Sequence, residues 1–246
     1  MMLLEKPDLE YFEKGITENP KLWSRFGGEP SFEGLRVLDV GCGHGSLCVD
    51  IASKGAKKVI GVDINERLIK FANEIVFQRF PQLKNKIDFL CCDITDLRED
   101  EFNIIISKNS FEHIINLDKA FVAMKQKLKI EGMMYIGFGP LWNSPYGDHR
   151  RTKAIIPWGH LIFSESFLIN RVNKHRQNKV FSLYDLGLNK LSLSEYKELF
   201  YNSGLTVLYF RANMSNNPIS KLFTLLSRIS FLEEYFTHQL YCILKK

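Results

Sequence analysis

The sequence predicts an α/β fold built on a doubly wound, mostly parallel sheet of seven strands. Short apolar runs alternate with amphipathic segments five times in succession, as parallel strands joined by crossover helices require. The first apolar run ends in a glycine-rich turn and an amphipathic pattern follows at once, which indicates strand, turn and helix. Of the 246 residues, 45% are apolar and 25% are charged, so the chain can bury a substantial core.

The first strand and its turn form the stretch Leu35–Ser46, with glycines at positions 41, 43 and 45. Glycine lets the chain reverse sharply and lets backbone amides approach a ligand, because a Cβ would block both. This spacing differs from the G-x-G-x-x-G of dinucleotide-binding folds, and Asp39 precedes the first glycine by two residues. A carboxylate there would repel a pyrophosphate but pair with the ammonium of a zwitterionic ligand. The turn therefore favours an amino-acid cofactor over a dinucleotide.

The run V-L-D-V-G-C-G-H-G-S resembles the first motif of the class I S-adenosylmethionine-dependent methyltransferases. This resemblance implies a Rossmann-like methyltransferase fold, an antiparallel last strand and S-adenosyl-L-methionine as the cofactor. The cofactor-binding residues that it implies in this run are Asp39, Gly41, Cys42, Gly43 and Gly45. The alternative is an ordinary strand-to-helix turn in which the glycines serve geometry alone.

The second strand, 57–62, follows a helix that ends near Gly55 and leads to Asp63. Asp63 lies 22 residues after Gly41, where this topology places an acid that accepts hydrogen bonds from ribose hydroxyls. Capping of the next helix is a rival role for Asp63, but Asn65 can cap that helix by itself. We therefore expect the ribose role for Asp63.

The third strand, 87–92, follows a helix that stops before Pro81, and it leads to Asp93 and Ile94. The resemblance implies that Asp93 accepts from the adenine amino group and that Ile94 lies beside the ring. The alternative for Asp93 is a plain surface aspartate at a strand end. The cofactor-binding set implied by the resemblance is completed by Ile64 and Ser107.

The fourth strand, 102–107, is a continuous apolar run, as expected for a central strand that is buried on both faces. The following S-K-N-S-F-E-H-I resembles the fourth motif of small-molecule methyltransferases, in which this loop lies near the transferring methyl. His113 is therefore a candidate substrate-binding residue. The N-P-P-Y and acidic signatures of amine and base methylation are absent from this loop, which argues against a nucleic-acid base as substrate. A helix closing near Gly132 and a fifth strand, 133–138, complete the alternation.

The segment 140–190 breaks this rhythm, and such a long connection usually has a function. We expect a substrate-side insertion, because loops at the carboxyl edge of a sheet are where substrate recognition is built. It holds two of the three tryptophans and three of the six histidines. The candidate substrate-binding residues in it are Trp142, Tyr146, Arg150 and Trp158.

His149 and His160 are the candidate general bases, because a histidine with a pKa of ~6.5 can take a proton from a hydroxyl as the methyl arrives. Each of them has the alternative of a structural, hydrogen-bonding histidine. Arg150 and Arg151 bind a carboxylate or phosphate of the substrate, or else form a solvated pair. A metal site made of Asp148, His149 and His160 is a minor alternative; its spacing matches no known site, and we expect no metal.

The ends of the chain carry further signals. Ser192–Glu195 is a capping box that opens a helix ending at Gly204, and a sixth strand, 205–210, follows. Asn217–Pro218 opens another helix, and 238–244 is the last strand. At the other end, the segment 1–33 is either a helix and loop packed outside the sheet or a lid with a hinge at Gly27–Gly28.

The expected organisation is therefore a single methyltransferase domain, 1–246. It consists of the N-terminal lid segment, a cofactor-binding half at 34–139, the insertion at 140–190 and a C-terminal part at 191–246. The expected activity is methyl transfer to a small molecule at oxygen, with a histidine base. The alternatives are N- or C-methylation, including that of tRNA or rRNA, a non-catalytic protein that binds S-adenosylmethionine, and an NAD-dependent oxidoreductase, whose glycine spacing is missing.

Composition narrows the partners and the compartment. The net charge of +5 comes from 33 basic and 28 acidic residues without a long basic run, so a nucleic-acid partner is not expected. Five cysteines, without paired C-x-x-C spacing, suit a reducing cytoplasm. A run of ~20 apolar residues that would span a bilayer is absent from the sequence, so we expect a soluble protein. The sequence leaves the methyl acceptor and the oligomeric state open.

Overall fold

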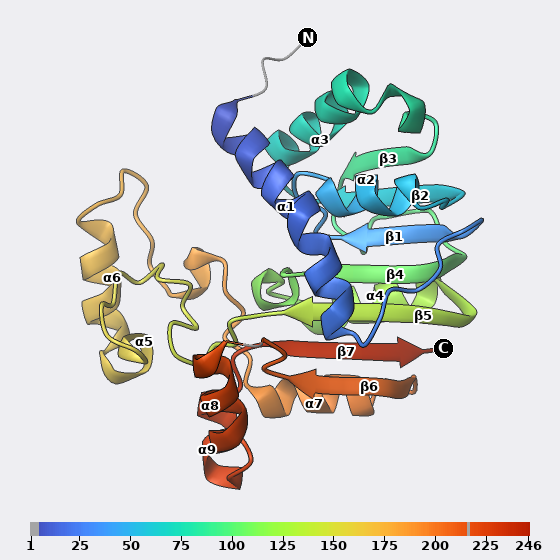
Figure 1. Cartoon of the computed structure of the whole chain (residues 1–246). Coiled ribbons are helices and arrows are strands. Elements are labelled where there is room, and N and C mark those ends of the chain that lie inside the picture. The colour runs from blue at the N-terminus through green and yellow to red at the C-terminus, as the bar shows by residue number, and fades with distance from the viewer. Residues whose placement is uncertain (1–4, 216) are drawn as a thin grey trace. The chain divides into compact units, whose positions relative to one another are not determined.

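The computed structural model describes residues 5–215 and 217–246. Among these residues the strands form one seven-stranded sheet in the order β3-β2-β1-β4-β5-β7-β6 (Figure 1). The predicted doubly wound α/β class is confirmed, and β7 runs antiparallel to β5, as the resemblance implied. The strands are β1 (Arg36–Val40), β2 (Lys58–Asp63), β3 (Ile87–Cys91), β4 (Phe102–Lys108), β5 (Leu128–Phe138), β6 (Thr206–Ala212) and β7 (Leu240–Lys245).

The helices follow the predicted alternation and add elements inside the insertion. The helices are α1 (Lys6–Arg25), α2 (Ser46–Ser53), α3 (Glu66–Arg79), α4 (Leu117–Lys127), α5 (Gly159–Ile162), α6 (Glu165–Asn173), α7 (Leu193–Tyr201), α8 (Pro218–Leu226) and α9 (Ser230–Phe236). Short 3₁₀ turns are η1 (Pro81–Leu83), η2 (Phe111–His113) and η3 (Tyr184–Leu186). Three predicted caps are confirmed, since the side chains of Asn65, Ser192 and Asn217 each accept a backbone N–H at a helix start.

The chain divides into two compact units. The first unit contains Met1–Lys108, Lys119–Ile136 and Cys242–Lys246, and the second contains Asn109–Asp118 and Gly137–Tyr241. The first unit therefore holds the start of the sheet with its glycine turn. The second unit holds the segments that follow β4 and β5, including the whole insertion. No helix within the described ranges has both the length and the apolar content to cross a bilayer.

The first unit is organised by the parallel strands β1, β2, β3 and β4. β1 pairs with β2 from Arg36 opposite Lys58 onward, and with β4 from Val37 opposite Ile104. Four of the five β1 residues are buried, as expected for a strand covered on both faces. This register brings the carboxyl ends of β1 and β2 together, so that the glycine turn after β1 lies beside Asp63 at the end of β2.

The boundary between α4 and β5 differs from the prediction. We expected the helix to continue to about Gly132 and the strand to begin at Met133, whereas α4 ends at Lys127 and β5 begins at Leu128. The reason is pairing with the end of the chain. The Lys246 backbone bonds to Glu131 and Gly132, and Lys246 Nζ donates to the carbonyls of Lys125 and Leu128. These contacts cap the helix and extend the strand, and local periodicity does not reveal them.

The second unit has a small core of its own. Ala154, Leu168, Val172, Val180, Leu183 and Leu186 form one buried cluster, with Trp142 packed against it. The insertion is therefore a folded segment with α5, α6 and η3 rather than a bare loop. A further helix, α9, lies between the predicted helix at 218 and the last strand and was not predicted.

The N-terminal segment forms α1, which packs in the first unit. Phe12, Leu22 and Trp23 are buried, and Gly15 lies so close to the start of α2 that an added Cβ would come within 2.2 Å of Ser46 Oγ. Figure 1 shows α1 beside α2 on one face of the sheet. The packed alternative for this segment is therefore supported, and lid motion about Gly27–Gly28 stays a prediction.

Candidate functional site

The glycine turn after β1 has the backbone geometry that the sequence predicts. Gly41, Gly43 and Gly45 have φ values of 76°, 52° and 79°, a left-handed region in which a Cβ is costly. At Gly45 an added Cβ would come within 2.6 Å of the Phe89 ring on β3, so glycine is also needed there for packing. A Cβ built on Gly43 meets no atom of the described residues within 4 Å, so space is open in front of the turn.

Asp63 ties the turn to the end of β2. Its Oδ2 accepts a hydrogen bond from the Gly43 N–H at 2.9 Å, and its Oδ1 accepts from the Asn65 N–H at 2.9 Å. Each carboxylate oxygen can accept a second hydrogen bond, because a carboxylate offers about four acceptor positions. Asn65 caps α3 itself, so Asp63 is left with acceptor capacity for two hydroxyls, as the ribose prediction requires.

Asp39 is buried beside the turn. Its exposed fraction is 2%, and Oδ2 accepts a hydrogen bond from Cys48 Sγ at 3.3 Å. Burial raises the pKa of the Asp39 carboxyl to about 7, although the Cys48 hydrogen bond and the charge of Lys108 lower it. Pairing with a ligand ammonium, which would favour the ionised form, stays a prediction for Asp39.

Two further predicted residues hold the strand ends in place. The N–H groups of Gly41 and Cys42 both donate to the Val62 carbonyl, at 2.8 and 3.1 Å. Ser107 Oγ donates to the Val40 carbonyl at 3.0 Å from a fully buried position. These bonds fix β1 against its two neighbouring strands, so Cys42 and Ser107 shape the turn whether or not they touch a ligand.

The adenine prediction concerns the ends of β2 and β3. Asp93 Oδ1 accepts from the backbone N–H and the hydroxyl of Thr95, at 2.8 and 2.7 Å, in a tight turn after β3. Ile94 is 4% exposed, whereas Ile64 at the end of β2 is 76% exposed. An exposed isoleucine offers an apolar surface to a planar ring, so Ile64 fits this role better than Ile94.

Known proteins resemble this chain in the region that contains the glycine turn and Asp63. Residues 31–139 match the family model described as "Methyltransferase domain". The chain is 32% identical over 193 residues to the ubiquinone biosynthesis O-methyltransferase of Bartonella quintana. These aligned residues make up 77% of this chain and 67% of that protein. The chain belongs to the class I S-adenosylmethionine-dependent methyltransferases.

Solved structures of such methyltransferases share the fold. The S-adenosylmethionine-dependent methyltransferase of Mesorhizobium loti superposes with a TM-score of 0.60 at 16% identity, over 93% of this chain and 97% of that one. Geranyl diphosphate C-methyltransferase of Streptomyces coelicolor, in complex with Mg²⁺, geranyl diphosphate and S-adenosyl-L-homocysteine, superposes with a TM-score of 0.59 at 16% identity, over 96% of this chain and 84% of that one. The chain spans about half to two thirds of the length of the curated relatives that it matches.

S-adenosylmethionine is the cofactor of this family, and the first unit fits it. The open space at Gly43 admits a ligand against the backbone, and Asp63 retains acceptor positions for the ribose. The start of α1 lies over the same turn. Asp8 Oδ1 contacts His44 Nε2 at 2.9 Å, and Arg67 donates to Asp8 Oδ2 at 2.5 Å. The hydrogen bond to His44 and the contact with Arg67 lower the pKa of Asp8, so α1 is held to the turn by an ionised carboxylate.

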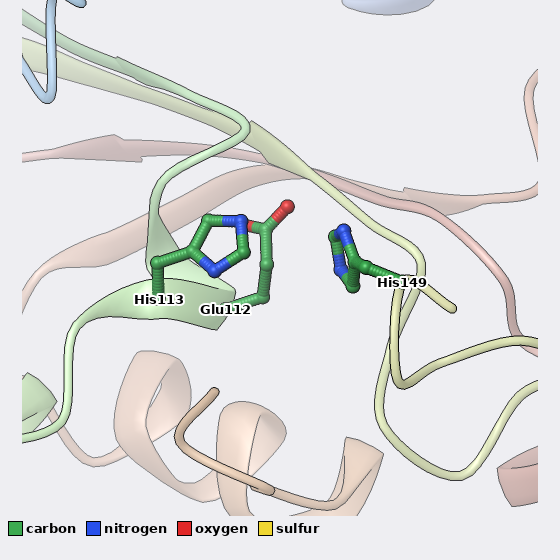
Figure 2. A group of neighbouring side chains, drawn as sticks. All are labelled: Glu112, His113 and His149. Carbon is green, nitrogen blue, oxygen red and sulfur yellow. The ribbon is translucent and has the colours of Figure 1, made fainter. Parts of the chain in front are cut away.

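In the second unit of this methyltransferase, the buried Glu112 and the partly buried His113 and His149 form a group that we call the Glu-His-His cluster (Figure 2). Glu112 and His113 lie in η2, directly after β4, and His149 comes from the loop after β5. Each residue offers one ligand atom, and these atoms lie within 4.8 Å of one another. The two imidazole rings are 4.9 Å apart between centroids.

The protonation states of the cluster follow from its burial. Glu112 is 3% exposed, and burial raises its pKa to about 8, although hydrogen bonds from its own backbone and from Gly139 and the charge of Arg151 lower it. Burial lowers the pKa of His149 to about 4, with smaller contributions from His113 and Arg151. Burial also lowers the pKa of His113. Both histidines are therefore neutral at pH 7.

Hydrogen bonds decide which ring nitrogen of each histidine carries the lone pair. His113 Nδ1 lies 2.8 Å from the Gly187 carbonyl, and since a carbonyl only accepts, Nδ1 is the protonated nitrogen. His149 bonds to the Pro140 carbonyl, and its buried Nε2 has no partner among the described residues, so Nδ1 makes that bond. Each Nε2 therefore carries the lone pair.

His160, the other candidate base, is placed differently. Its Nε2 bonds to the Trp142 carbonyl at 2.6 Å, and its Nδ1 lies 3.7 Å from Asp148 Oδ1. Asp148 in turn accepts from the backbone N–H and the hydroxyl of Thr152, at 3.1 and 2.5 Å. Nε2 donates to the Trp142 carbonyl, so the lone pair of His160 lies on Nδ1 and faces the Asp148 carboxylate. His160 is 4% exposed, whereas His149 is only partly buried, so a substrate reaches His149 more easily.

The candidate substrate-binding residues of the insertion fall into two places. Tyr146 and Arg150 contact each other, with the guanidinium carbon 4.8 Å from the ring centroid, and both line a pocket of about 470 Å³. The cationic residues of this pocket are Arg150, Lys153 and Arg171. Trp142 packs instead on His160, at 4.8 Å between centroids, and Trp158 packs on Phe236, at 5.3 Å.

Arg151 differs from its neighbour Arg150. Its guanidinium donates to the carbonyls of Leu186 and Gly187, the second at 3.1 Å. Arg151 thus fixes the segment that also holds His113, and it is committed to backbone contacts. Glu112 was not among the predicted site residues, although its position beside His113, shortly after a central buried strand, could have indicated it.

Proposed function

We propose that this methyltransferase transfers a methyl group from S-adenosylmethionine to a hydroxyl oxygen of a small molecule. The observation that carries the proposal is the 32% identity to a ubiquinone biosynthesis O-methyltransferase across 77% of the chain. That relative acts at oxygen, as its name states, and the buried Nε2 of His149 supplies the base that an oxygen acceptor needs. For the substrate we propose only a chemical class, small molecules that carry a hydroxyl group.

The cofactor supplies an activated methyl on sulfur, and the protein residues have the remaining tasks. We assign the ribose hydroxyls to Asp63 and the adenine surface to Ile64 and Asp93, on the contacts given above. Methyl transfer to a hydroxyl would form a carbon–oxygen bond, break the bond between the methyl carbon and sulfur to leave S-adenosylhomocysteine, and release the hydroxyl proton. His149 Nε2 accepts that proton, because Nδ1 is occupied at Pro140 and the neutral ring has a free lone pair.

The order of the elements along the chain supports the assignment of cofactor binding to Asp63 and of proton transfer to His149. In open α/β sheets, ligands bind beyond the carboxyl ends of the strands. The glycine turn and Asp63 follow the carboxyl ends of β1 and β2, and the segments bearing the Glu-His-His cluster follow those of β4 and β5. The pocket with Arg150, Lys153 and Arg171 supports a substrate that also carries a carboxylate or phosphate.

A matched pair of acceptors tests the oxygen assignment. The purified chain is incubated with S-adenosylmethionine labelled at the methyl, and with hydroxybenzoates or their aminobenzoate counterparts of the same shape. We expect S-adenosylhomocysteine and a labelled methyl ether from the hydroxy series alone. His149→Ala should lose at least about 100-fold in rate, within the usual range for a general base. Gln177→Ala, an exposed position in the insertion, is the control.

Two results would count against this proposal. Methylation of the amino series, with none of the hydroxy series, would reassign the acceptor to nitrogen. Calorimetry that shows no binding of S-adenosylmethionine to the folded chain at high micromolar concentration would remove the activity altogether.

A further inference from the structure

We propose that the pocket of the insertion, which we call the basic pocket, binds a dianionic phosphoryl group, and that the methyl acceptor is a phosphate ester rather than a carboxylic acid. This assignment rests on the proposed methyl transfer to a small hydroxyl compound and specifies the second group of that compound. The basic pocket has a volume of about 470 Å³, within the range of small-molecule sites, and lies wholly in the second unit. Its polar lining consists of Tyr146, Arg150, Lys153, Arg171 and His175.

The positive charges of the basic pocket have no counter-charge. None of the described residues that line it is acidic. Arg150, Lys153 and Arg171 form no ion pair with a carboxylate of the described residues, whereas other surface cations, such as Lys54 and Arg79, do. Like charges around one cavity repel one another, and a bound anion would offset that repulsion.

The acids that lie nearest along the chain are bound elsewhere. Asp148 is 1% exposed and accepts from the backbone N–H and the hydroxyl of Thr152, at 3.1 and 2.5 Å. Glu165, at the start of α6, accepts from the Leu183 N–H at 2.8 Å, and its other oxygen lies 3.7 Å from Lys190 Nζ. These contacts hold both carboxylates away from the pocket lining.

Arg171 joins the two walls of the basic pocket. Its Nε donates to the Lys153 carbonyl at 2.9 Å, which leaves its terminal nitrogens without a partner among the described residues. The carbonyls at the end of α6 carry partial negative charge, but Lys179 Nζ donates to those of Asn173 and Arg176, at 2.6 and 3.4 Å. Arg171 is thus placed for the bidentate contact that guanidinium groups make with phosphoryl oxygens.

The other wall of the basic pocket has an uncommon backbone. Of the ten non-glycine residues with positive φ in the described ranges, four lie between positions 146 and 153: Tyr146, His149, Arg150 and Lys153. Residues in this conformation are held there by their surroundings and cluster at ligand sites. Arg150 directly follows His149, so the proposed base and the pocket wall belong to one segment. We therefore assign the anion to the methyl acceptor.

The charge of the basic pocket selects the anion. A carboxylate carries one negative charge, whereas a phosphate ester carries about 1.5 to 2 at pH 7 and has three acceptor oxygens. Arg150, Lys153 and Arg171 supply three positive charges, and His175 adds a ring nitrogen. A phosphoryl group therefore matches the charge and the donors of the pocket better than a carboxylate does.

The test is calorimetric titration of phenyl phosphate, and of benzoate as its carboxylate counterpart, into the full chain in phosphate-free buffer without S-adenosylmethionine. We expect saturable binding of phenyl phosphate with a Kd of about 0.01–1 mM, and benzoate at least about 10-fold weaker. Arg150→Gln and Lys153→Gln should each weaken phenyl phosphate binding about 10-fold. The control is Arg176→Gln, which removes an exposed cation next to His175 along the chain and should bind as the unmodified chain does.

A second measurement needs no variant. Phenylglyoxal modifies accessible arginines, and peptide mass spectrometry locates the products. Phenyl phosphate should protect Arg150 and Arg171 and leave Arg176 reactive. Protection of all three arginines, or of none, would contradict a site in the basic pocket.

Methyl transfer tests the assignment of the phosphoryl group to the acceptor. With labelled S-adenosylmethionine, the kcat/KM for para-hydroxyphenyl phosphate should exceed that for para-hydroxybenzoate at least about 10-fold. Methylation of neither compound, with phenyl phosphate still bound, would count against the proposed methyl transfer and still support the pocket.

Three results would overturn the inference. Phenyl phosphate that does not saturate or binds no tighter than benzoate excludes a phosphoryl site, and so does full affinity in both pocket variants. Equal methylation of the two acceptors refutes the phosphate ester. Sedimentation of the chain with phosphatidic acid vesicles, without binding of phenyl phosphate, would assign the pocket to a lipid headgroup instead.

Discussion

Replacement of Asp39 by Asn tests whether the carboxyl beside the glycine turn is uncharged in the folded protein. Burial raises its pKa from the usual 3.8 to about 7, although Cys48 donates a hydrogen bond to it. The folded state therefore holds a proton that the unfolded chain has already lost between about pH 4 and pH 7. Because the folded state binds more protons in this window, its stability falls as the pH rises, by up to about 1.4 kcal/mol per pH unit.

The size of the effect follows from the two pKa values. Between pH 5 and pH 8 the ionisation of Asp39 should reduce the free energy of unfolding by roughly 3 kcal/mol, and the loss should level off above pH 7. Asparagine is nearly isosteric, can still accept from Cys48 and does not titrate. Asp39→Asn should therefore match the unmodified chain near pH 4 and gain stability over it as the pH rises.

Urea denaturation of both proteins at pH 5, 6, 7 and 8, monitored by far-ultraviolet circular dichroism, measures this difference. The absolute free energies matter less than the gap between the two proteins, because other groups titrate equally in both. A gap that stays constant from pH 5 to pH 8 would refute the reasoning, since it would mean that Asp39 is ionised throughout and that its neighbours offset the cost of burial.

The remaining predictions concern single contacts. Asp63→Ala should weaken S-adenosylmethionine binding in calorimetry by about 10- to 100-fold, because charged hydrogen bonds are lost. The control is Asp88→Ala, which removes an exposed acid on β3 that pairs with Lys58 on β2 and should leave the affinity unchanged. Equal affinities of the two variants would show that the ribose assignment is wrong. Asp8→Ala removes the partner of His44 and Arg67 and should lower the free energy of unfolding by about 1–2 kcal/mol. The backbone amides of α1 should then exchange hydrogen faster. Unchanged exchange in residues 6–25 would mean that aromatic packing alone holds α1 against the first unit. His160→Ala should lower the free energy of unfolding by about 2–4 kcal/mol without changing the shape of the pH–rate profile; a changed profile would restore His160 as the base.

The cofactor half was largely predictable because its signals are local. Alternating apolar and amphipathic segments indicated the strands and helices, and the glycines at 41, 43 and 45 indicated a sharp turn, which the structure builds with positive φ values at all three. The capping box at Ser192 and the cap at Asn65 were confirmed for the same reason. Each of these features depends on a few adjacent residues and on backbone conformation.

The other half of the candidate site depends on distant segments. His149 and His160 look alike in sequence, but His149 is partly buried and its Nε2 has no partner among the described residues, whereas His160 is 4% exposed and its ring faces Asp148. Arg150 and Arg151 are adjacent, yet one lines a pocket and the other is committed to carbonyls 35 and 36 residues away. These differences arise from desolvation and from partners brought close by folding.

The α/β class, the glycine turn and the acids at the strand ends could be predicted from the residues alone, because periodicity and backbone preference depend on neighbouring residues. Folding, in contrast, places the start of β5 at Leu128, buries Asp39 and brings Glu112 together with His113 and His149 in one cluster. Burial and hydrogen-bond partners fix a side chain's charge and its available lone pairs, and both come from segments far apart along the chain.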